Sequence, residues 1–176
     1  MTLRPSLTRY IVLLGIVCVT TGTLLFRSNA RSQTLTLGSV SGIRGQSVWF
    51  DVTLSIESKS IAGTQNDITF NGANIPIGTC VKNDQLTKDV SLTFLPAGCT
   101  GAACTSVRII FSSMSDNSAL DDLIVLYRCR VDIPSGAALG NYPLTISNVS
   151  GGDPVGNFVA MTGVNGQVTV GCSGCC

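Results

Sequence analysis

Two groups of side chains in this sequence could bind a metal ion. Asp116, Asp121 and Asp122 form the densest acidic cluster, and clustered carboxylate oxygens are the ligands that calcium prefers. The cluster lacks the Asp-x-Asp-x-Asp-Gly spacing of a dedicated calcium loop, so we predict a solvated turn, with calcium as the alternative. Residues 172–176 include three cysteines, but three thiolates without a histidine are an incomplete zinc set. We therefore assign no metal, and we expect this tail to hold one disulfide and a free thiol, or a bridge to another chain.

The composition excludes the commonest catalytic side-chain pairs. The sequence has no histidine and a single glutamate, Glu57, which excludes a Ser-His or Cys-His nucleophile pair and a histidine proton shuttle. Asp121 and Asp122 fail as a glycosidase pair because neighbours on a strand point to opposite faces. A net charge of +1 without a basic run argues against a nucleic-acid partner. Chemistry by Asp, Lys, Tyr or Cys side chains is not excluded by the composition, and we predict no cofactor.

Aromatic and basic side chains offer a different chemistry, the recognition of sugars. Trp49 and Tyr127 could stack on a sugar ring, because aromatic rings present a flat apolar face. A linear platform for a polysaccharide needs several coplanar exposed aromatics, and beyond residue 32 the chain has one tryptophan and two tyrosines. Arg128 and Arg130 share one strand face, on either side of Cys129, and we expect both to pair with acids across the sheet.

The first 32 residues are typical of an export signal. A short basic leader, residues 1–9, precedes an uncharged, mostly apolar run over residues 10–26, and Ser28-Asn29-Ala30 fits a signal-peptidase site. The run is shorter and more polar than the roughly 20 apolar residues of a membrane span. We predict a signal helix that is removed near Ala30 or Ser32, which makes the protein secreted or displayed at the cell surface. The alternative is an uncleaved anchor, and only then would the membrane be a partner.

From Thr34 onward the apolar residues recur with period two, the mark of half-buried strands. Val48, Phe50 and Val52, for example, alternate with Trp49 and Asp51. Glycine-rich turns separate the strands, and no stretch keeps a helical period beyond two turns. About nine or ten short strands predict a single two-sheet antiparallel β-sandwich over residues 33–171, followed by the Cys-rich tail 172–176. Strands are expected at 90–95, 107–111, 123–133, 142–147, 158–162 and 167–170.

One of these strands departs from the alternating pattern. The continuous apolar run in 123–133 predicts a strand covered on both faces or crossing between sheets.

Seven cysteines remain after the signal segment, and cysteines of exported proteins usually pair. Cys99 and Cys104 bracket a short loop of small residues and make the best local pair. Cys80 and Cys129 then form the long-range pair. We predict both disulfides.

Four segments, taken in order, resemble a known family. Residues 35–54 lead through Gly-Ile-Arg-Gly into alternating valines, and residues 61–70 begin Ile-Ala-Gly and end on Phe70. Residues 133–144 contain Gly-Asn-Tyr-Pro, and residues 166–170 read Gly-Gln-Val-Thr-Val. Together they resemble the cohesin domain family. The resemblance implies a nine-stranded jelly-roll sandwich, related in fold to carbohydrate-binding modules, that binds the dockerin of another protein and catalyses nothing.

The resemblance also implies where a partner binds, because residues 61–70 match a strand that contributes to the docking face of cohesins. Ala62, Ile68 and Phe70 are expected to face inward. The outward residues Gln65, Asp67 and Thr69 are therefore the predicted partner contacts. The expected function is docking of a dockerin-like protein partner at the cell surface or in an extracellular assembly linked to polysaccharide breakdown. The alternative is a carbohydrate-binding or adhesive surface module on the same fold.

Overall fold

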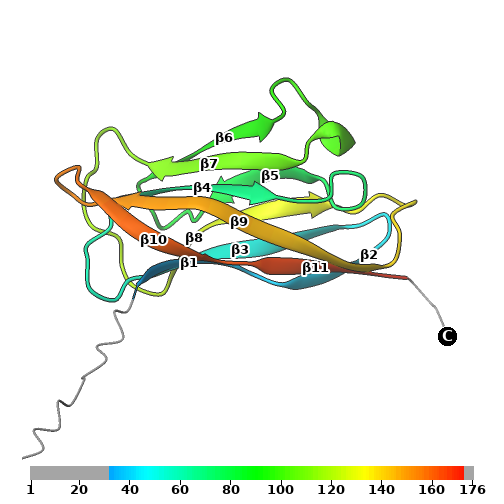
Figure 1. Ribbon diagram of the computed structural model, residues 1–176, viewed down its shortest axis with the longest axis horizontal. Helices are drawn as coiled ribbons and strands as arrows, with labels where there is room; N and C mark the ends of the chain where they lie inside the picture. The colour runs from blue at the N-terminus through cyan, green and yellow to red at the C-terminus, as the bar shows by residue number, and fades with distance from the viewer. Residues whose placement is uncertain (1–31, 173–176) are drawn as a thin grey trace, which may run out of the picture.

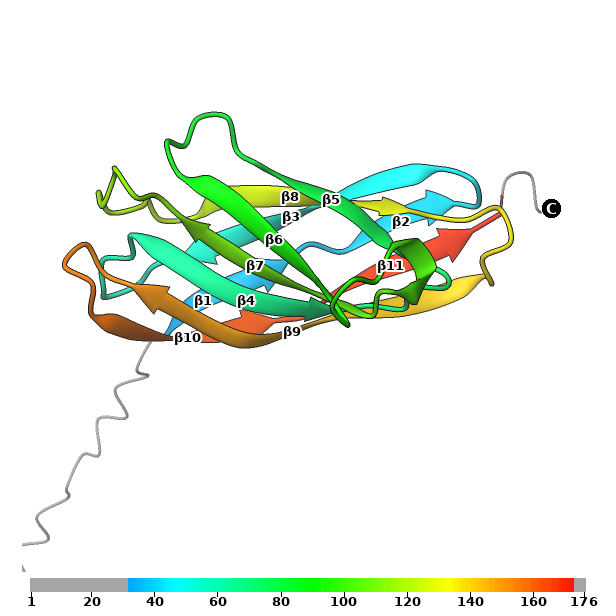
Figure 2. The same ribbon diagram turned by 90° about the horizontal axis from the view of Figure 1, so that it is seen from above.

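The computed structural model describes residues 32–172, and this part of the chain is built almost entirely of β-strands. Figure 1 and Figure 2 show the strands in two layers laid face to face, with the chain entering at one end and leaving at the other. Within residues 32–172 no helix is long and apolar enough to cross a membrane. The elements are β1 (Gln33–Leu37), β2 (Val40–Ile43), β3 (Ser47–Ser55), β4 (Gly63–Thr69), β5 (Ile77–Lys82), β6 (Asp89–Leu95), the short 3₁₀ helix η1 (Gly101–Ala103), β7 (Ser106–Ser112), β8 (Ile124–Asp132), β9 (Gly140–Gly152), β10 (Phe158–Val164) and β11 (Gly166–Gly171).

The strands form two layers that share β10. One layer has the order β5-β8-β3-β1-β10, and the other has the order β10-β9-β4-β7-β6. β11 pairs with both β9 and β2. Most neighbours are antiparallel, but β1 pairs with β10 and β2 pairs with β11 in parallel. The all-β sandwich predicted from the sequence is confirmed, and the two parallel pairs are an addition to the antiparallel pattern expected.

The first and last strands of the sandwich are each broken in the middle, so the nine expected strands become eleven. The breaks fall at Gly38-Ser39 and at Asn165. A Cβ on Gly166 would lie 2.4 Å from the carbonyl oxygen of Gly38, so only glycine allows the two backbones to approach this closely. Because the first and last strands run in the same direction, their pairing is parallel.

The inward side chains of the alternating pattern fill the space between the layers. Phe50 and Val52 on β3, and Ile109 and Phe111 on β7, are completely buried, as expected for the inward residues of two packed sheets. The rings of Phe111 and Tyr127 meet between the layers, with their centroids 6.2 Å apart. These contacts join the two sheets through a single core.

The continuous apolar run in 123–133 lies in strand β8. The register of β3 against β8 shifts between Val52 and Thr53, so that Leu126 is an extra residue on β8. Leu126 and Tyr127 are therefore both buried although they are neighbours. The strand keeps one outward face, where Arg128 is exposed, so it is neither covered on both faces nor crosses between sheets.

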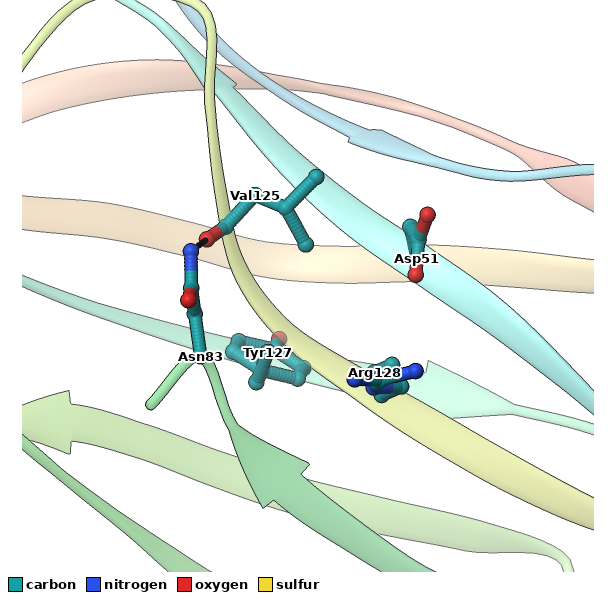
Figure 3. Close-up of a pocket in the computed structure, with 5 residues that line it drawn as sticks. All are labelled: Asp51, Asn83, Val125, Tyr127 and Arg128. Carbon is teal, nitrogen blue, oxygen red and sulfur yellow. Dashed lines mark hydrogen bonds between the residues drawn. The ribbon is translucent and has the colours of Figure 1, made fainter. Parts of the chain in front are cut away.

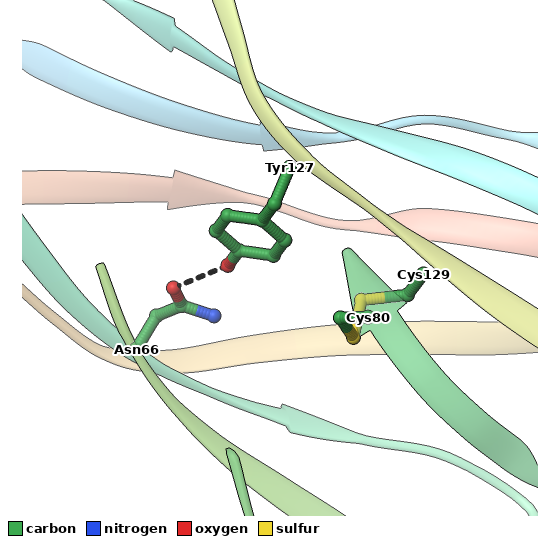
Figure 4. The surroundings of a disulfide bond; sticks show 4 residues. All are labelled: Asn66, Cys80, Tyr127 and Cys129. Atoms are coloured by element: carbon green, nitrogen blue, oxygen red, sulfur yellow. Dashed lines mark hydrogen bonds between the residues drawn. A yellow bond between two sulfur atoms is a disulfide. The ribbon is translucent and has the colours of Figure 1, made fainter. Parts of the chain in front are cut away.

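Tyr127 points into the core, which excludes it from stacking on a sugar. Its hydroxyl donates a 2.7 Å hydrogen bond to the side-chain oxygen of Asn66 (Figure 4). Burial raises the pKa of Tyr127, although the hydrogen bond to Asn66 acts in the opposite direction. The sequence could not show this orientation, because the bulge at Leu126 reverses the alternation.

Each layer carries one disulfide, and both join the cysteines expected from the sequence. Cys80 on β5 is bonded to Cys129, its direct neighbour on β8, with the Cα atoms 4.0 Å apart (Figure 4). Cys99 and Cys104 close the loop around η1 between β6 and β7. The signal segment predicted over 1–32 and the tail 172–176 lie outside the described residues, apart from Ser32 and Cys172, and stay predictions.

Candidate docking face

Strand β4 lies in the middle of its layer, between β9 and β7. Ile68 on this strand is completely buried against the core, and the alternate residues Gln65, Asp67 and Thr69 lie on the outer face. Thr69 is exposed and Gln65 is half-buried. Asp67 is only 7% exposed, so it does not offer an open carboxylate to a partner as the sequence led us to expect.

Two neighbouring side chains cover Asp67. The guanidinium of Arg108 on β7 donates to both carboxylate oxygens, at 2.7 and 2.8 Å, and the side-chain amide of Asn148 on β9 donates at 2.7 Å. The Arg108 hydrogen bond lowers the pKa of Asp67; burial raises it, and the Asn148 hydrogen bond lowers it again. The same carboxylate raises the pKa of Arg108. Asp67 therefore holds Arg108 in a fixed, bidentate geometry on the outer face.

A β-bulge brings Asn148 to this position. Gln65 pairs with Ser150 and Asp67 pairs with Ser147, so β9 has one extra residue between these two pairs. Asn148 adopts φ 51°, a left-handed conformation that asparagine tolerates better than most residues. The bulge thus aims an amide donor at the Asp67 carboxylate.

The rest of the outer face is flat and nearly uncharged toward β10. Ile110 on β7, 40% exposed, lies opposite Gln65, and beside them is a hollow of about 270 Å³. The hollow exists because several of its lining residues are glycines, which have no side chain to fill it, among them Gly63 and Gly152. Phe158 on β10 pairs with Gly152 and is 76% exposed. We call the surface formed by Gln65, Asp67, Thr69, Arg108, Ile110, Asn148, Gly152 and Phe158 the docking face.

Five of these residues, Gly152 among them, are missed by the sequence interpretation. Arg108 and Ile110 alternate with the inward Val107, Ile109 and Phe111, so their outward direction was readable, but their position beside β4 was not. Asn148 and Phe158 depend on the bulge in β9 and on the pairing of β9 with β10. Nothing in a period-two pattern identifies which strands are neighbours.

The acidic cluster considered as a calcium site lies in the connection between β7 and β8, and its carboxylates accept hydrogen bonds from different segments of the chain. Hydrogen bonds from Ser118 and Thr87 lower the pKa of the Asp116 carboxyl. Asp122 instead accepts a hydrogen bond of 2.6 Å from the backbone N–H of Ile56. Over residues 32–172 no three His, Cys, Asp or Glu side chains are grouped to hold a metal ion.

The outer face of the other layer carries Trp49, whose direction the sequence left open. Trp49 points outward and is 40% exposed, and the guanidinium of Arg128 lies 6.0 Å from the centre of its ring. Arg130 pairs with Asp132 on its own strand, with Nε 2.9 Å from the carboxylate. The expectation that both arginines pair with acids across the sheet is therefore wrong, because residues two apart on a strand share a face and a stacked ring can replace an acid.

No protein-family model matches the chain, and no curated protein sequence matches it. Solved structures do match. The sixth cohesin of scaffoldin B from Acetivibrio cellulolyticus, solved with a mutant Cel5 dockerin, is 22% identical with a TM-score of 0.62, over 80% of this chain and 100% of that one. A type I cohesin–dockerin complex from Clostridium thermocellum has 13% identity and a TM-score of 0.67, over 80% and 99% of the two chains.

A third match is a non-cellulosomal cohesin from the archaeon Archaeoglobus fulgidus, 12% identical, with a TM-score of 0.62 over 80% of this chain and 92% of that one. Likenesses at this level of identity establish the fold. The described chain therefore has a cohesin-like fold, as the sequence motifs led us to expect.

Proposed function

We propose that the protein is an exported, non-catalytic module that binds a dockerin-like protein partner through the docking face. The cohesins from Acetivibrio cellulolyticus and Clostridium thermocellum that match its fold were solved in complex with dockerins, which supports a protein partner here. Two disulfides support an oxidising compartment, and hence a place at the cell surface or in an extracellular assembly linked to polysaccharide breakdown.

The observation that carries this proposal is the fixed position of Arg108. A guanidinium that donates two hydrogen bonds to Asp67 loses little freedom when it meets a partner, so less of the binding free energy is spent on ordering it. Around it lie an apolar contact, Ile110, and a row of short polar side chains. This combination of a rigid charge, an apolar centre and small polar groups suits a flat protein surface.

Within the face, Gln65 and Thr69 are the proposed direct contacts. They lie on the same strand as Asp67, at two-residue steps of about 7 Å, and this strand is held between β7 and β9, so the backbone that carries them is already ordered. Asp67 contributes by positioning Arg108. Of the three residues predicted from the sequence, Gln65 and Thr69 are thus proposed to contact the partner, and Asp67 is proposed to position Arg108.

The sharpest test fills the hollow. A Cβ at Gly152 would meet no heavy atom within 4 Å, so Gly152→Leu adds a side chain to the docking face without a clash. We expect the variant to keep its melting temperature and to bind a partner dockerin at least about tenfold more weakly, because the added side chain holds the two surfaces apart.

The matched control is Gly136→Leu, at a loop glycine that is equally free of neighbours. The binding measurements are calorimetric titrations of dockerins encoded in the same genome, with the Gln65→Ala, Asp67→Ala, Thr69→Ala triple variant alongside. If a dockerin binds and Gly152→Leu and the triple variant both match the wild type, the docking face lies elsewhere. If no dockerin binds, the proposed function is wrong.

A further inference from the structure

The opposite layer presents two opposite charges that the fold leaves uncommitted. Asp51 on β3 and Arg128 on β8 are directly opposite in the strand register, and both are exposed. Within residues 32–172, neither side chain forms an ion pair within 4.0 Å or a hydrogen bond with another described residue. The Arg128 guanidinium instead lies over the ring of Trp49, 6.0 Å from its centre.

A hollow of about 240 Å³ opens beside these charges (Figure 3). It is lined by Asp51, Asn83, Val125, Tyr127 and Arg128. The Asn83 amide donates a 2.9 Å hydrogen bond to the carbonyl oxygen of Val125, so one wall of the hollow is fixed by the loop after β5. Asp51 and Arg128 are the two charged residues of this lining.

The opposite charges of Asp51 and Arg128 together favour a neutral ligand over a charged one. An anion that approaches Arg128 is opposed by Asp51, and a cation that approaches Asp51 is opposed by Arg128. A neutral molecule with adjacent hydroxyl groups satisfies both, because one hydroxyl can donate to the carboxylate while its neighbour accepts from the guanidinium. The ring of Trp49 lies under the Arg128 guanidinium and is 40% exposed, and its exposed part offers an apolar surface for a further ring.

We propose that this surface, which we call the Trp49 face, binds a neutral oligosaccharide. Asp51 and Arg128 bind hydroxyl groups of one sugar, and Trp49 stacks on a neighbouring sugar of the same chain. The Trp49 face lies on the outer side of β3 and β8, in the layer opposite the docking face. A glycan and a protein partner can therefore be bound at once, and this inference does not depend on the proposed docking function.

The test uses the protein alone. Trp49 is the only tryptophan in the chain, so its fluorescence reports directly on this face. We would titrate cellohexaose, xylohexaose and mannohexaose, with polygalacturonate as the anionic probe, and measure fluorescence and calorimetric heat. At least one neutral hexasaccharide is expected to shift the fluorescence and to bind, and polygalacturonate is expected not to bind.

Variants then locate the site. Asp51→Ala and Arg128→Ala are expected to weaken binding about tenfold or more, the usual loss for hydrogen bonds to charged groups. Asp121→Ala removes an exposed aspartate from the loop before β8, outside the hollow, and is expected to leave affinity unchanged. Melting curves check that each variant is folded. The proposal is overturned if no neutral hexasaccharide binds, if only the anionic polymer binds, or if binding is the same in Asp51→Ala and Arg128→Ala.

Discussion

The two outer faces of the sandwich treat their charges in opposite ways. On the docking face, Asp67 and Arg108 are joined by two short hydrogen bonds, and Asn148 completes the carboxylate. On the Trp49 face, Asp51 and Arg128 are equally close in register and yet form no ion pair. Register alone therefore does not decide whether opposite charges on neighbouring strands combine.

The difference is set by what else lies beside each pair. A bulge in β9 supplies Asn148 and shields Asp67, and this partial burial strengthens the pair. Beside Arg128 the neighbour is Trp49, which attracts the guanidinium through its ring and leaves Asp51 in solvent. A completed pair is part of the fold, whereas an open pair is available to a ligand. The predictions below test this contrast.

The largest expected effect compares the disulfides of the two layers. Cys80 and Cys129 are 49 residues apart in the sequence, and Cys99 and Cys104 are 5 apart. Because a disulfide stabilises mainly by restricting the unfolded chain, Cys80→Ala with Cys129→Ala should cost about 4 kcal/mol, and Cys99→Ala with Cys104→Ala about 2 kcal/mol. Urea denaturation of the two double variants measures both. Equal losses would show that local strain or packing, and not loop length, controls the stability of the two layers.

The next effect compares the two aspartates directly. Asp67→Asn removes a nearly buried carboxylate from a bidentate pair, and we expect it to lower the free energy of unfolding by about 2 kcal/mol. Asp51→Asn is a surface substitution without a partner, and the expected change is within about 0.5 kcal/mol. Both values come from urea denaturation at neutral pH. Similar losses in the two variants would contradict the division into a committed and an uncommitted pair.

The stability difference between wild type and Asp67→Asn should depend on pH, because the Asp67 carboxylate can be protonated. The pKa of Asp67 is lowered in the folded protein, chiefly by Arg108, from an ordinary value of 3.8. A lowered pKa means that ionised Asp67 stabilises the fold above pH 3.8, and that this stability is lost as the pH falls through the folded value. The difference between wild type and Asp67→Asn should therefore shrink below pH 3.8.

Urea midpoints measured between pH 6 and pH 2 would show this convergence. The comparison with Asp67→Asn removes the acid sensitivity that other carboxyls, such as Asp116 and Asp153, give to both proteins. A difference between the two proteins that stays constant down to pH 2 would mean that the ionised form of Asp67 is not what stabilises the docking face.

Much of the architecture could be predicted from the sequence, because the pattern of residues along each strand is local information. The pairing of strands could not be predicted in this way. Period-two alternation gave the strands, the inward residues Ile68 and Phe70, and the outer position of Gln65 and Thr69. Cysteine spacing gave both disulfide pairs. The alternation carries no information on which strands are neighbours, so the contact of β4 with β7 and β9 had to come from the structure.

The errors at the candidate site have a common physical cause, which is the β-bulge. At Leu126 a bulge reverses the alternation and turns Tyr127 into the core, where we expected a ring that could stack on a sugar. At Asn148 a second bulge covers Asp67, where we expected an open carboxylate. A bulge adds a single residue, and the only sequence sign of either was the unbroken apolar run before Arg128.

The smallest expected effect concerns the stacking of Arg128 on Trp49. Arg128→Ala removes an exposed cation–π contact, worth about 0.5–1 kcal/mol, and should lower the free energy of unfolding by no more than this. It also uncovers the indole, so the fluorescence of Trp49 should shift to longer wavelength. Lys82→Ala, which removes a half-buried cation of the neighbouring strand β5 that pairs with Asp89, is the control and should leave the emission unchanged. A loss of about 2 kcal/mol or more in Arg128→Ala would place Arg128 in a structural network as tight as that of Arg108, since hydrogen bonds to charged groups contribute on that scale. The Trp49 face would then be part of the fold, and the contrast between the two faces would disappear.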